Sequence, residues 1–285
     1  MKLNVRQDDI EFGENILKVK VPKALRNKVK SGLEYFDAAL GGEGFTPSQV
    51  LFFTGTPGSG KTTMLLTLAD RLTKSGALVV FNTAEESLYQ VKLIAERLGL
   101  RSGFSVGQET LMPTLLEKCD ALRNKRGNKK KPFFLLVDSL QCMDDGKYSN
   151  GSINRASAER CLAQITDYCK TNYCNSVVIG QVNKSGQMAG TNKLKHMVDA
   201  MMELSVEEKD ADLRGCRVLQ TTKNRFGGCG HTFFLALNKR GFKEVARVSL
   251  RLDLVRPDGQ PRHPLLAGRT SFHTQIKIKK AMPPV

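Results

Sequence analysis

The sequence has few of the features that mark secreted, zinc-binding or membrane proteins. Its seven cysteines, an odd number, form no C-x-x-C pair, so it indicates neither a disulfide framework nor a zinc site, and reduced thiols are expected. No run at the start of the chain or later is apolar over the length of a signal peptide or a membrane span. We therefore expect a cytoplasmic protein that has no membrane partner.

Acidic residues are also in deficit. The 285 residues include 44 Lys and Arg against 28 Asp and Glu, which gives a formal net charge of +16. This excess predicts a polyanionic partner. An anionic membrane surface is the alternative, but no basic amphipathic helix is evident, so nucleic acid is the preferred partner. The length suits one large α/β domain, or one domain with tails.

What the chain does contain is a complete phosphate-binding motif. Residues 55–62, Gly-Thr-Pro-Gly-Ser-Gly-Lys-Thr, match every fixed position of G-x-x-x-x-G-K-[ST]. An apolar run precedes the motif and a segment of helical period follows it, which is the context that the motif requires. Lys61 is expected to bridge the β- and γ-phosphates of ATP, and Thr62 to ligate Mg²⁺. The expected cofactor-binding residues are Thr56, Pro57, Gly58, Ser59, Gly60, Lys61, Thr62 and Thr63.

Apolar runs that alternate with segments of helical period indicate an α/β fold. The alternating runs are QVLFFTG, ALVVFNTA, PFFLLVDS and SVVIGQV. They predict a mainly parallel sheet that is covered by helices on both faces. Two further runs, 217–223 and 232–238, follow each other across a glycine-rich segment. They predict a C-terminal β-hairpin that closes the sheet at one edge.

Composition suggests where the domain begins and ends. Residues 1–30 are charged and weakly periodic, which predicts an N-terminal arm or linker. Residues 250–285 hold five of the ten prolines together with many Lys and Arg, which predicts a basic C-terminal tail. The ATPase core is then expected to span residues 31–249.

Acidic residues at the ends of two expected strands complete a candidate site. Asp138 ends one apolar run, and downstream of a phosphate loop it is the expected partner of Thr62 in holding Mg²⁺. Glu85 and Glu86 follow another run, where one carboxylate could orient and deprotonate an attacking water. The same pair also suits an acidic helix N-terminus, so both interpretations stay open.

Beyond these motifs, the sequence resembles the RadA/Sms ATPases of the RecA and DnaB superfamily. The resemblance runs from about residue 31 to about residue 240, through SGLEYFDAALGGEGF, the phosphate loop, FNTAEESLYQVKLIAERLGL, LLVDSLQ, VIGQVNKSGQMAGTNKLKHMVDAMMEL and TTKNRFGG. It implies a RecA-like P-loop ATPase core that uses ATP and Mg²⁺. It covers only the central part of RadA proteins, and we expect this chain to lack their zinc-binding module and Lon-like domain.

The resemblance implies catalytic roles residue by residue. Glu85 matches the catalytic glutamate of the superfamily. Gln181 stands where RecA-like proteins carry a polar residue that senses the γ-phosphate, although RadA proteins usually have His there. Lys223 and Arg225, in the KNRFG motif that is the most specific of the set, match a pair that reaches the nucleotide of the neighbouring subunit.

Two segments, 142–158 and 183–197, resemble the DNA-binding loops of the family. Their candidate contacts with DNA phosphates are Lys147, Arg155, Lys184, Lys193 and Lys195. A third basic stretch, RNKRGNKKKP at 123–132, is expected to be a solvated turn between a helix and a strand.

These features together predict a DNA-stimulated ATPase that translocates on single-stranded DNA in recombination, branch migration or repair. We expect a homo-oligomer, as a hexameric ring, and a recombinase or replication protein is a candidate partner. A RecA-like recombinase filament and a KaiC-like regulatory ATPase without DNA remain alternatives, and the net charge of +16 argues against the second. A small-molecule kinase is disfavoured because the sequence indicates neither a lid nor an acceptor site.

Overall fold

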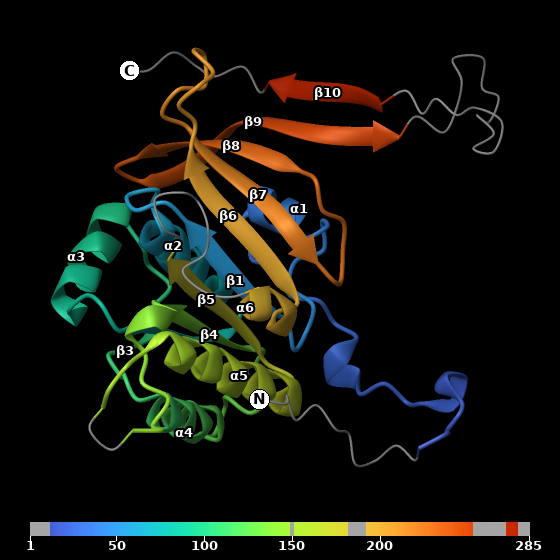
Figure 1. Ribbon diagram of the computed structural model, residues 1–285, viewed down its shortest axis with the longest axis vertical. Helices are drawn as coiled ribbons and strands as arrows, with labels where there is room; N and C mark the ends of the chain where they lie inside the picture. Colours follow the sequence, from blue (N-terminus) through green and yellow to red (C-terminus); the bar gives the residue numbers. More distant parts are fainter. Residues whose placement is uncertain (1–11, 149–150, 182–191, 253–271, 279–285) are drawn as a thin grey trace.

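One mixed sheet runs through the part of the protein that the computed structural model describes, residues 12–148, 151–181, 192–252 and 272–278 (Figure 1). Its ten strands lie in the order β3-β2-β4-β5-β1-β6-β7-β8-β9-β10. Neighbours from β3 to β6 are parallel, and those from β6 to β10 are antiparallel. The strands are β1 Val50–Gly55, β2 Leu78–Thr83, β3 Ser105–Gly107, β4 Phe133–Asp138, β5 Asn175–Gln181, β6 Ala200–Val206, β7 Arg217–Asn224, β8 Thr232–Asn238, β9 Gly241–Leu252 and β10 Phe272–Ile278.

Helices cover both faces of the parallel half of the sheet (Figure 1). They are α1 Glu34–Ala39, α2 Lys61–Lys74, α3 Leu88–Leu98, α4 Met112–Arg123, α5 Arg155–Asn172 and α6 Asn192–Met197, with 3-10 turns at Ile16–Lys18, Lys23–Leu25 and Leu140–Cys142. Within the described ranges, the helices are all too short or too polar to cross a bilayer.

Successive side chains of the central strands point alternately into two hydrophobic cores, one on each face of the sheet. In β1, Leu51 and Phe53 pack with α1, α2 and α3, whereas Val50 and Phe52 pack with α4, α5 and α6. Successive side chains of a strand point to opposite faces, so a strand that is covered on both sides is apolar throughout. The predicted sheet with helices on both faces is confirmed.

Local signals set the ends of the predicted helices. α2 begins directly after Gly60, which has a left-handed φ of 100°. A capping box between Ser87 and Gln90 starts α3, and Gly99, with φ of 68°, ends it. Asn154 caps α5 in the same way as Ser87 caps α3. Because β1, β2 and β4 belong to the parallel part of the sheet, the loops that follow them lie at one end of it.

The predicted hairpin forms, but it does not close the sheet. β7 and β8 are antiparallel as expected. β9 then pairs with β8 across a tight turn at residues 239–240, and β10 pairs with β9. The β9 sequence, GFKEVARVSLRL, mixes apolar with charged residues: Lys243 is exposed, whereas Glu244 and Arg247 form an ion pair with each other. A search for continuous apolar runs misses such a strand.

β10 lies inside the segment that the sequence predicts to be a basic tail. The sequence analysis also leaves out β3, which has only three residues, and β6. The boundaries 1–30, 31–249 and 250–285 stay predictions.

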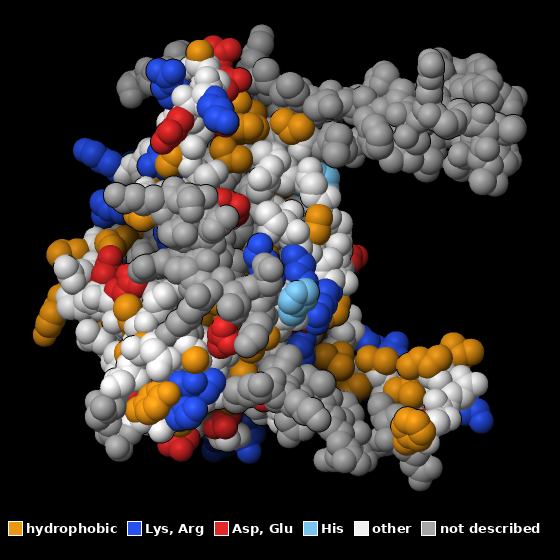
Figure 2. All heavy atoms as spheres, in the orientation of Figure 1, with side chains coloured by type: hydrophobic (Ala, Val, Ile, Leu, Met, Phe, Trp, Pro, Cys, Tyr) orange, Lys and Arg blue, Asp and Glu red, His pale blue; other side chains and the backbone are white. Residues whose placement is uncertain are grey.

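Residues 12–30 run away from the sheet and expose apolar side chains. A bridge between Val29 and Phe45 joins this segment to the body. Phe12, Ile16 and Leu17 are at least 78% exposed, and Figure 2 shows the apolar side chains along this segment at the lower right. Exposed apolar surface of this kind is typical of a contact with another molecule.

Gly180 in β5 allows a close approach of β1, which makes a test of the core possible. A Cβ on Gly180 would lie 2.1 Å from Cζ of the buried Phe52 ring. We expect Gly180→Ala to lower the free energy of unfolding by about 1–3 kcal/mol through overpacking, measured by denaturant titration. Gly228→Ala is the matched control, since its Cβ would meet nothing within 4 Å. Equal stability of the two variants would contradict the packing described.

Candidate nucleotide site

The phosphate-binding motif joins the carboxyl end of β1 to α2, as the sequence predicts. Gly58 and Gly60 have φ of 74° and 100°, a region that side chains rarely adopt. A Cβ on Gly55 would lie 2.2 Å from the Leu204 carbonyl oxygen. The glycines therefore fix the path of the loop and keep its backbone open to a ligand.

The loop carries polar groups that suit bound phosphates. Ser59 Oγ is buried and has no hydrogen-bond partner among the described residues. Lys61 Nζ donates to the carbonyl oxygens of Gly55 and Thr56 at 2.9 Å and 3.0 Å, and burial lowers the pKa of Lys61. Phosphate oxygens are stronger acceptors for an ammonium than neutral carbonyls. A partly buried lysine beside an unpartnered hydroxyl fits the phosphates of a nucleotide.

Thr62 and Asp138 meet beside the loop. Thr62 Oγ1 donates to Asp138 Oδ2 at 2.6 Å. The pKa of Asp138 is raised to about 6, chiefly by burial and also by the nearby carboxylates of Glu85 and Glu86, against the lowering effect of the Thr62 hydrogen bond. A hydroxyl and a carboxylate are the oxygen ligands that Mg²⁺ prefers, with water and phosphate completing its shell. The pair fits a Mg²⁺ ion bound together with a nucleotide.

Glu85 lies after the end of β2 and lines the same cavity as the phosphate loop. This cavity has a volume of about 480 Å³. The Ser139 hydroxyl, next to Asp138, donates to Glu85 Oε1, and Cys142 Sγ lies 3.5 Å from the same oxygen. The sequence analysis misses both neighbours because neither carries a charge. They orient a carboxylate toward the phosphate loop.

Glu86 also lines the cavity, but it is held differently. Its backbone N–H donates to Thr83 Oγ1 at 3.0 Å, and its Oε2 is buried without a hydrogen-bond partner among the described residues. α3 begins only at Leu88, after its cap Ser87, and has no acidic residue in its first turn. The two glutamates therefore lie directly before the cap of α3, at its N-terminal end, and both interpretations of the pair stay open.

Gln181 ends β5 beside the phosphate loop, since its register partner in β1 is Gly55. Its side chain lies outside the described residues, as do Lys184 and the side chains of Arg155 and Lys193. The roles predicted for these residues stay predictions.

Lys223 and Arg225 lie at the opposite end of the sheet from the phosphate loop. Lys223 pairs with Met201 at the start of β6, whose first residue pairs with Leu51 near the start of β1. The four steps from Leu51 to Gly55 span roughly 13 Å at about 3.3 Å per residue. The structure thus does not bring this cationic pair to the phosphate loop of its own chain.

The same pair holds the end of α6 through its backbone. Lys223 Nζ donates to the carbonyl oxygens of Lys195 and Val198 at 2.5 Å and 2.7 Å. Arg225 donates to the His196 carbonyl at 3.2 Å. Figure 2 shows Lys and Arg side chains gathered beside a histidine over the position of α6. The KNRFG motif is therefore in contact with the end of the second predicted DNA-binding segment.

Asp199 is a buried partner that the sequence analysis misses. Its carboxylate, 2% exposed, lies 2.6 Å from Lys170 Nζ and 3.4 Å from Arg225 Nη1. It also accepts the Val50 backbone N–H at 3.0 Å. Asp199 thereby ties Arg225 to β1 and α5. Its only signal in the sequence is one acidic residue between two apolar stretches.

Lys147 and Lys195, from the two predicted DNA-binding segments, are exposed. Lys147 Nζ lies 5.6 Å from the centre of the Tyr148 ring. The segment with Lys147 follows β4, on the side of the sheet where the phosphate loop lies, whereas Lys195 lies beside Lys223 at the opposite end. Residues 124–132 form the predicted connection between α4 and β4, and they are largely exposed.

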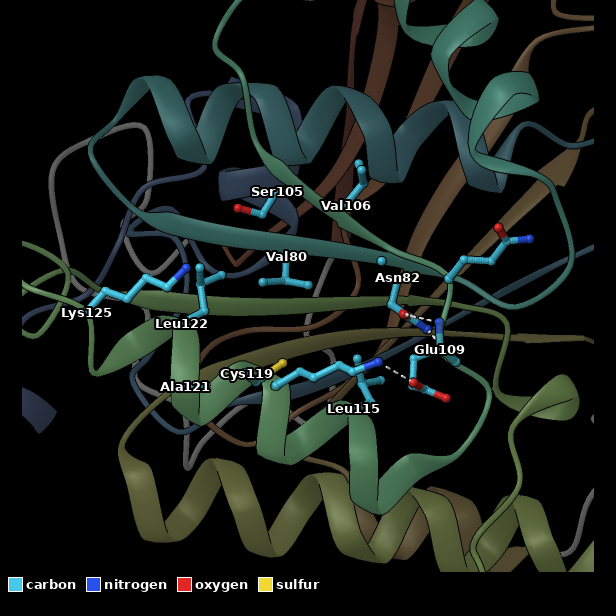
Figure 3. Close-up of a pocket in the computed structure, with 13 residues that line it drawn as sticks. Val80, Asn82, Ser105, Val106, Glu109, Leu115, Cys119, Ala121, Leu122 and Lys125 are labelled. Carbon is cyan, nitrogen blue, oxygen red and sulfur yellow. Dashed lines mark hydrogen bonds and ion pairs between the residues drawn. The ribbon is translucent and has the colours of Figure 1, made fainter.

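A second cavity, of about 340 Å³, opens between β3 and α4 (Figure 3). Glu109 at its rim is paired with Lys118 at 2.6 Å, and the Asn82 side chain bonds to the Glu109 backbone. Its walls are otherwise largely apolar, with Val80, Leu115 and Leu122 facing the space. Cys119 also lines the cavity, but burial raises the pKa of its thiol, which disfavours the reactive thiolate.

The strand order, the phosphate loop and the carboxylates beside it define a P-loop nucleotide-binding domain of RecA type. A family model described as "ATPase: KaiC" matches residues 29–109. A DnaB-like replicative helicase aligns with a TM-score of 0.65 at 14% identity, over 75% of this chain and 61% of that one. A second solved structure, of an ATPase domain, aligns with a TM-score of 0.65 at 14% identity, over 77% of this chain and 92% of that one. These structures confirm the fold.

Curated relatives identify the branch of the superfamily. The chain is 34% identical to the DNA repair protein RadA of Haemophilus influenzae over 225 residues, 78% of this chain and 46% of that protein. It is 31% identical to RadA of Streptococcus pneumoniae over 224 residues, 78% of this chain and 50% of that protein. The chain therefore contains a RadA-like ATPase domain of the RecA/DnaB superfamily. It spans about half the length of these relatives.

Proposed function

We propose that this chain is an ATP hydrolase of RadA type that works as a homo-oligomer on single-stranded DNA, in recombination, branch migration or repair. The observation that carries the proposal is one cavity lined by the phosphate loop, Asp138 and Glu85. Similarity to curated DNA repair proteins named RadA supports the choice of DNA.

The residues around this cavity have complementary tasks. Lys61 binds the β- and γ-phosphates, with its ammonium turned from the loop carbonyls to the phosphate oxygens. Thr62 and Asp138 would hold Mg²⁺, which would neutralise phosphate charge. Glu85 accepts a proton from the attacking water. The Ser139 hydroxyl donates a hydrogen bond to Glu85 Oε1 and so fixes the orientation of the carboxylate. Gln181, at the end of the neighbouring strand, senses the γ-phosphate.

The site is completed by a second subunit. Lys223 and Arg225 lie too far from their own phosphate loop to act there, so we assign them to the nucleotide of a neighbour. Their positive charge would stabilise the γ-phosphoryl group in the transition state. The exposed apolar residues of 12–17 supply a surface for such a neighbour. A hexameric ring is the assembly that we propose.

A recombinase filament is the second candidate. The exposed apolar N-terminal segment favours it, because filament formers join subunits through a segment that inserts into the next subunit. Both assemblies would share the same nucleotide chemistry.

One experiment tests the proposal and separates the candidates. ATP turnover is measured with and without single-stranded DNA, and the mass of the assembly is measured in each nucleotide state. A closed oligomer whose turnover rises with DNA supports the motor, and an open series of masses supports the filament. A fully active monomer, or turnover that ignores DNA, would contradict the proposal.

The predicted DNA contacts can be tested by charge removal. Lys184→Ala, Lys193→Ala and Lys195→Ala together are expected to weaken single-strand binding. Each lost phosphate contact should reduce the slope of log affinity against log salt by roughly 0.7, measured by fluorescence anisotropy of a labelled oligothymidylate. The control removes the same charge at exposed lysines elsewhere, Lys92, Lys209 and Lys243. An unchanged slope in the first variant would assign DNA binding to another surface.

A further inference from the structure

A large groove lies at the end of the sheet opposite the phosphate loop. It has a volume of about 1010 Å³. Three segments that are distant in the sequence form its walls: 23–30 before α1, 129–133 before β4, and 172–175 before β5. Because β4 and β5 are parallel to β1, their starting ends lie away from the nucleotide cavity. The groove is therefore separate from the site described above.

Basic side chains dominate this groove. Those that line it are Lys23, Lys28, Lys30, Arg123, Lys129, Lys130 and Lys131. No Asp or Glu is found among the described residues that line it. Lys28 is paired with Glu43 at 2.6 Å and Arg123 with Asp120 at 3.0 Å. The other five lysines form no ion pair with a described residue.

This pattern differs from other parts of the described surface. Elsewhere, several basic side chains have acidic neighbours, as in Lys118 with Glu109 and Arg247 with Glu244. Ammonium groups that line one groove without acidic partners repel one another. A bound polyanion removes that repulsion and releases its own counterions. The fold thus brings charges together in a way that favours a polyanionic ligand.

Other side chains of the groove suit a nucleic acid. Tyr173 lines it, at the left-handed position that ends α5, with φ of 52°. Asn27 and Asn172 line it too and carry amide groups. Aromatic rings provide stacking surfaces for unpaired bases, and amides bond to bases and phosphates. A flat membrane surface contacts convex faces rather than the floor of a groove.

We propose that this groove binds single-stranded nucleic acid through its phosphates, as a second surface apart from the two predicted DNA-binding loop segments. Lys129, Lys130 and Lys131 contact phosphates from one wall, and Lys23 and Lys30 from the other. Tyr173 stacks on a base. The 123–132 stretch, which looked like a solvated turn in the sequence, gains this role because the fold places residues 23–30 across from it.

Binding is tested with Lys129→Ala, Lys130→Ala and Lys131→Ala combined in the full chain, without ATP. We expect weaker binding of a labelled oligothymidylate and a salt slope that is lower by about 2, since three phosphate contacts are lost at roughly 0.7 each. The control variant Lys92→Ala, Lys209→Ala and Lys243→Ala carries the same net charge and should bind like the wild type. A slope equal to that of the control would overturn the proposal.

Cross-linking gives an independent readout of position. An oligonucleotide with 4-thiothymidine is expected to cross-link to peptides that contain Tyr173 or residues 129–131, and Tyr173→Ala should lose the first of these. Cross-links confined to 142–158 and 183–197 would overturn the proposal. So would a preference for duplex DNA or for phosphatidylserine vesicles over the oligonucleotide. Both assays are independent of ATP turnover, so a result against the groove proposal is distinguishable from a result against the proposed ATPase function.

Discussion

Replacing Glu85 with Gln is expected to slow ATP turnover by about 10²–10⁴-fold while nucleotide binding stays nearly unchanged. The substitution removes the proton acceptor but keeps the size of the side chain and the Ser139 contact. Lys61, Thr62 and the loop backbone, which would hold the nucleotide, are left intact. Turnover is measured as phosphate release, and binding with a fluorescent ATP analogue.

Two companion variants make this test specific. Glu86→Gln removes the other carboxylate of the cavity and is expected to stay active. If Glu86→Gln were inactive and Glu85→Gln active, the assignment between the two glutamates would be reversed. Lys61→Ala is expected to abolish hydrolysis, because its ammonium is the cation of the loop that faces the phosphates. Retained turnover in Lys61→Ala would remove the phosphate loop from the mechanism.

Replacing Arg225 with Ala is expected to keep ATP binding and to lower DNA-stimulated hydrolysis by roughly 10³–10⁵-fold. In the assembly that we propose, the guanidinium contributes to the transition state of a neighbouring subunit, so its loss should affect the rate rather than the affinity. The measurement is turnover at saturating single-stranded DNA. Arg225 is 52% exposed and its bond to Asp199 is long, at 3.4 Å, so the variant should melt close to the wild type.

Mixing two inactive proteins tests whether the site is shared. Subunits with Glu85→Gln and subunits with Arg225→Ala are each expected to be inactive alone. In a mixed assembly, some interfaces combine Glu85 of one parent with Arg225 of the other, and activity should return. No recovery in mixtures that are shown to co-assemble would indicate that Arg225 acts within its own subunit, or that the ring turns over only when every site is intact.

The sequence by itself determined the elements that depend on neighbouring residues. The glycines and Lys61 of the phosphate loop lie between a buried strand and a helix because apolar runs and helical periods are local patterns. Asp138 could be placed opposite Thr62 because its apolar run predicts a parallel strand, and parallel strands bring their carboxyl ends to one edge of the sheet. β9 could not be found in this way, because Lys243, Glu244 and Arg247 interrupt its apolar residues.

Only the tertiary structure decided which distant groups meet. Asp199 reaches Arg225, Lys170 and the start of β1 because the sheet aligns the starts of β1 and β6. The basic groove exists because the N-terminal segment folds beside the 129–131 lysines, about a hundred positions away in the sequence. Charge composition predicted a polyanionic partner, but Coulomb interactions depend on distance in space. The distances between these charges are defined only once the chain has folded.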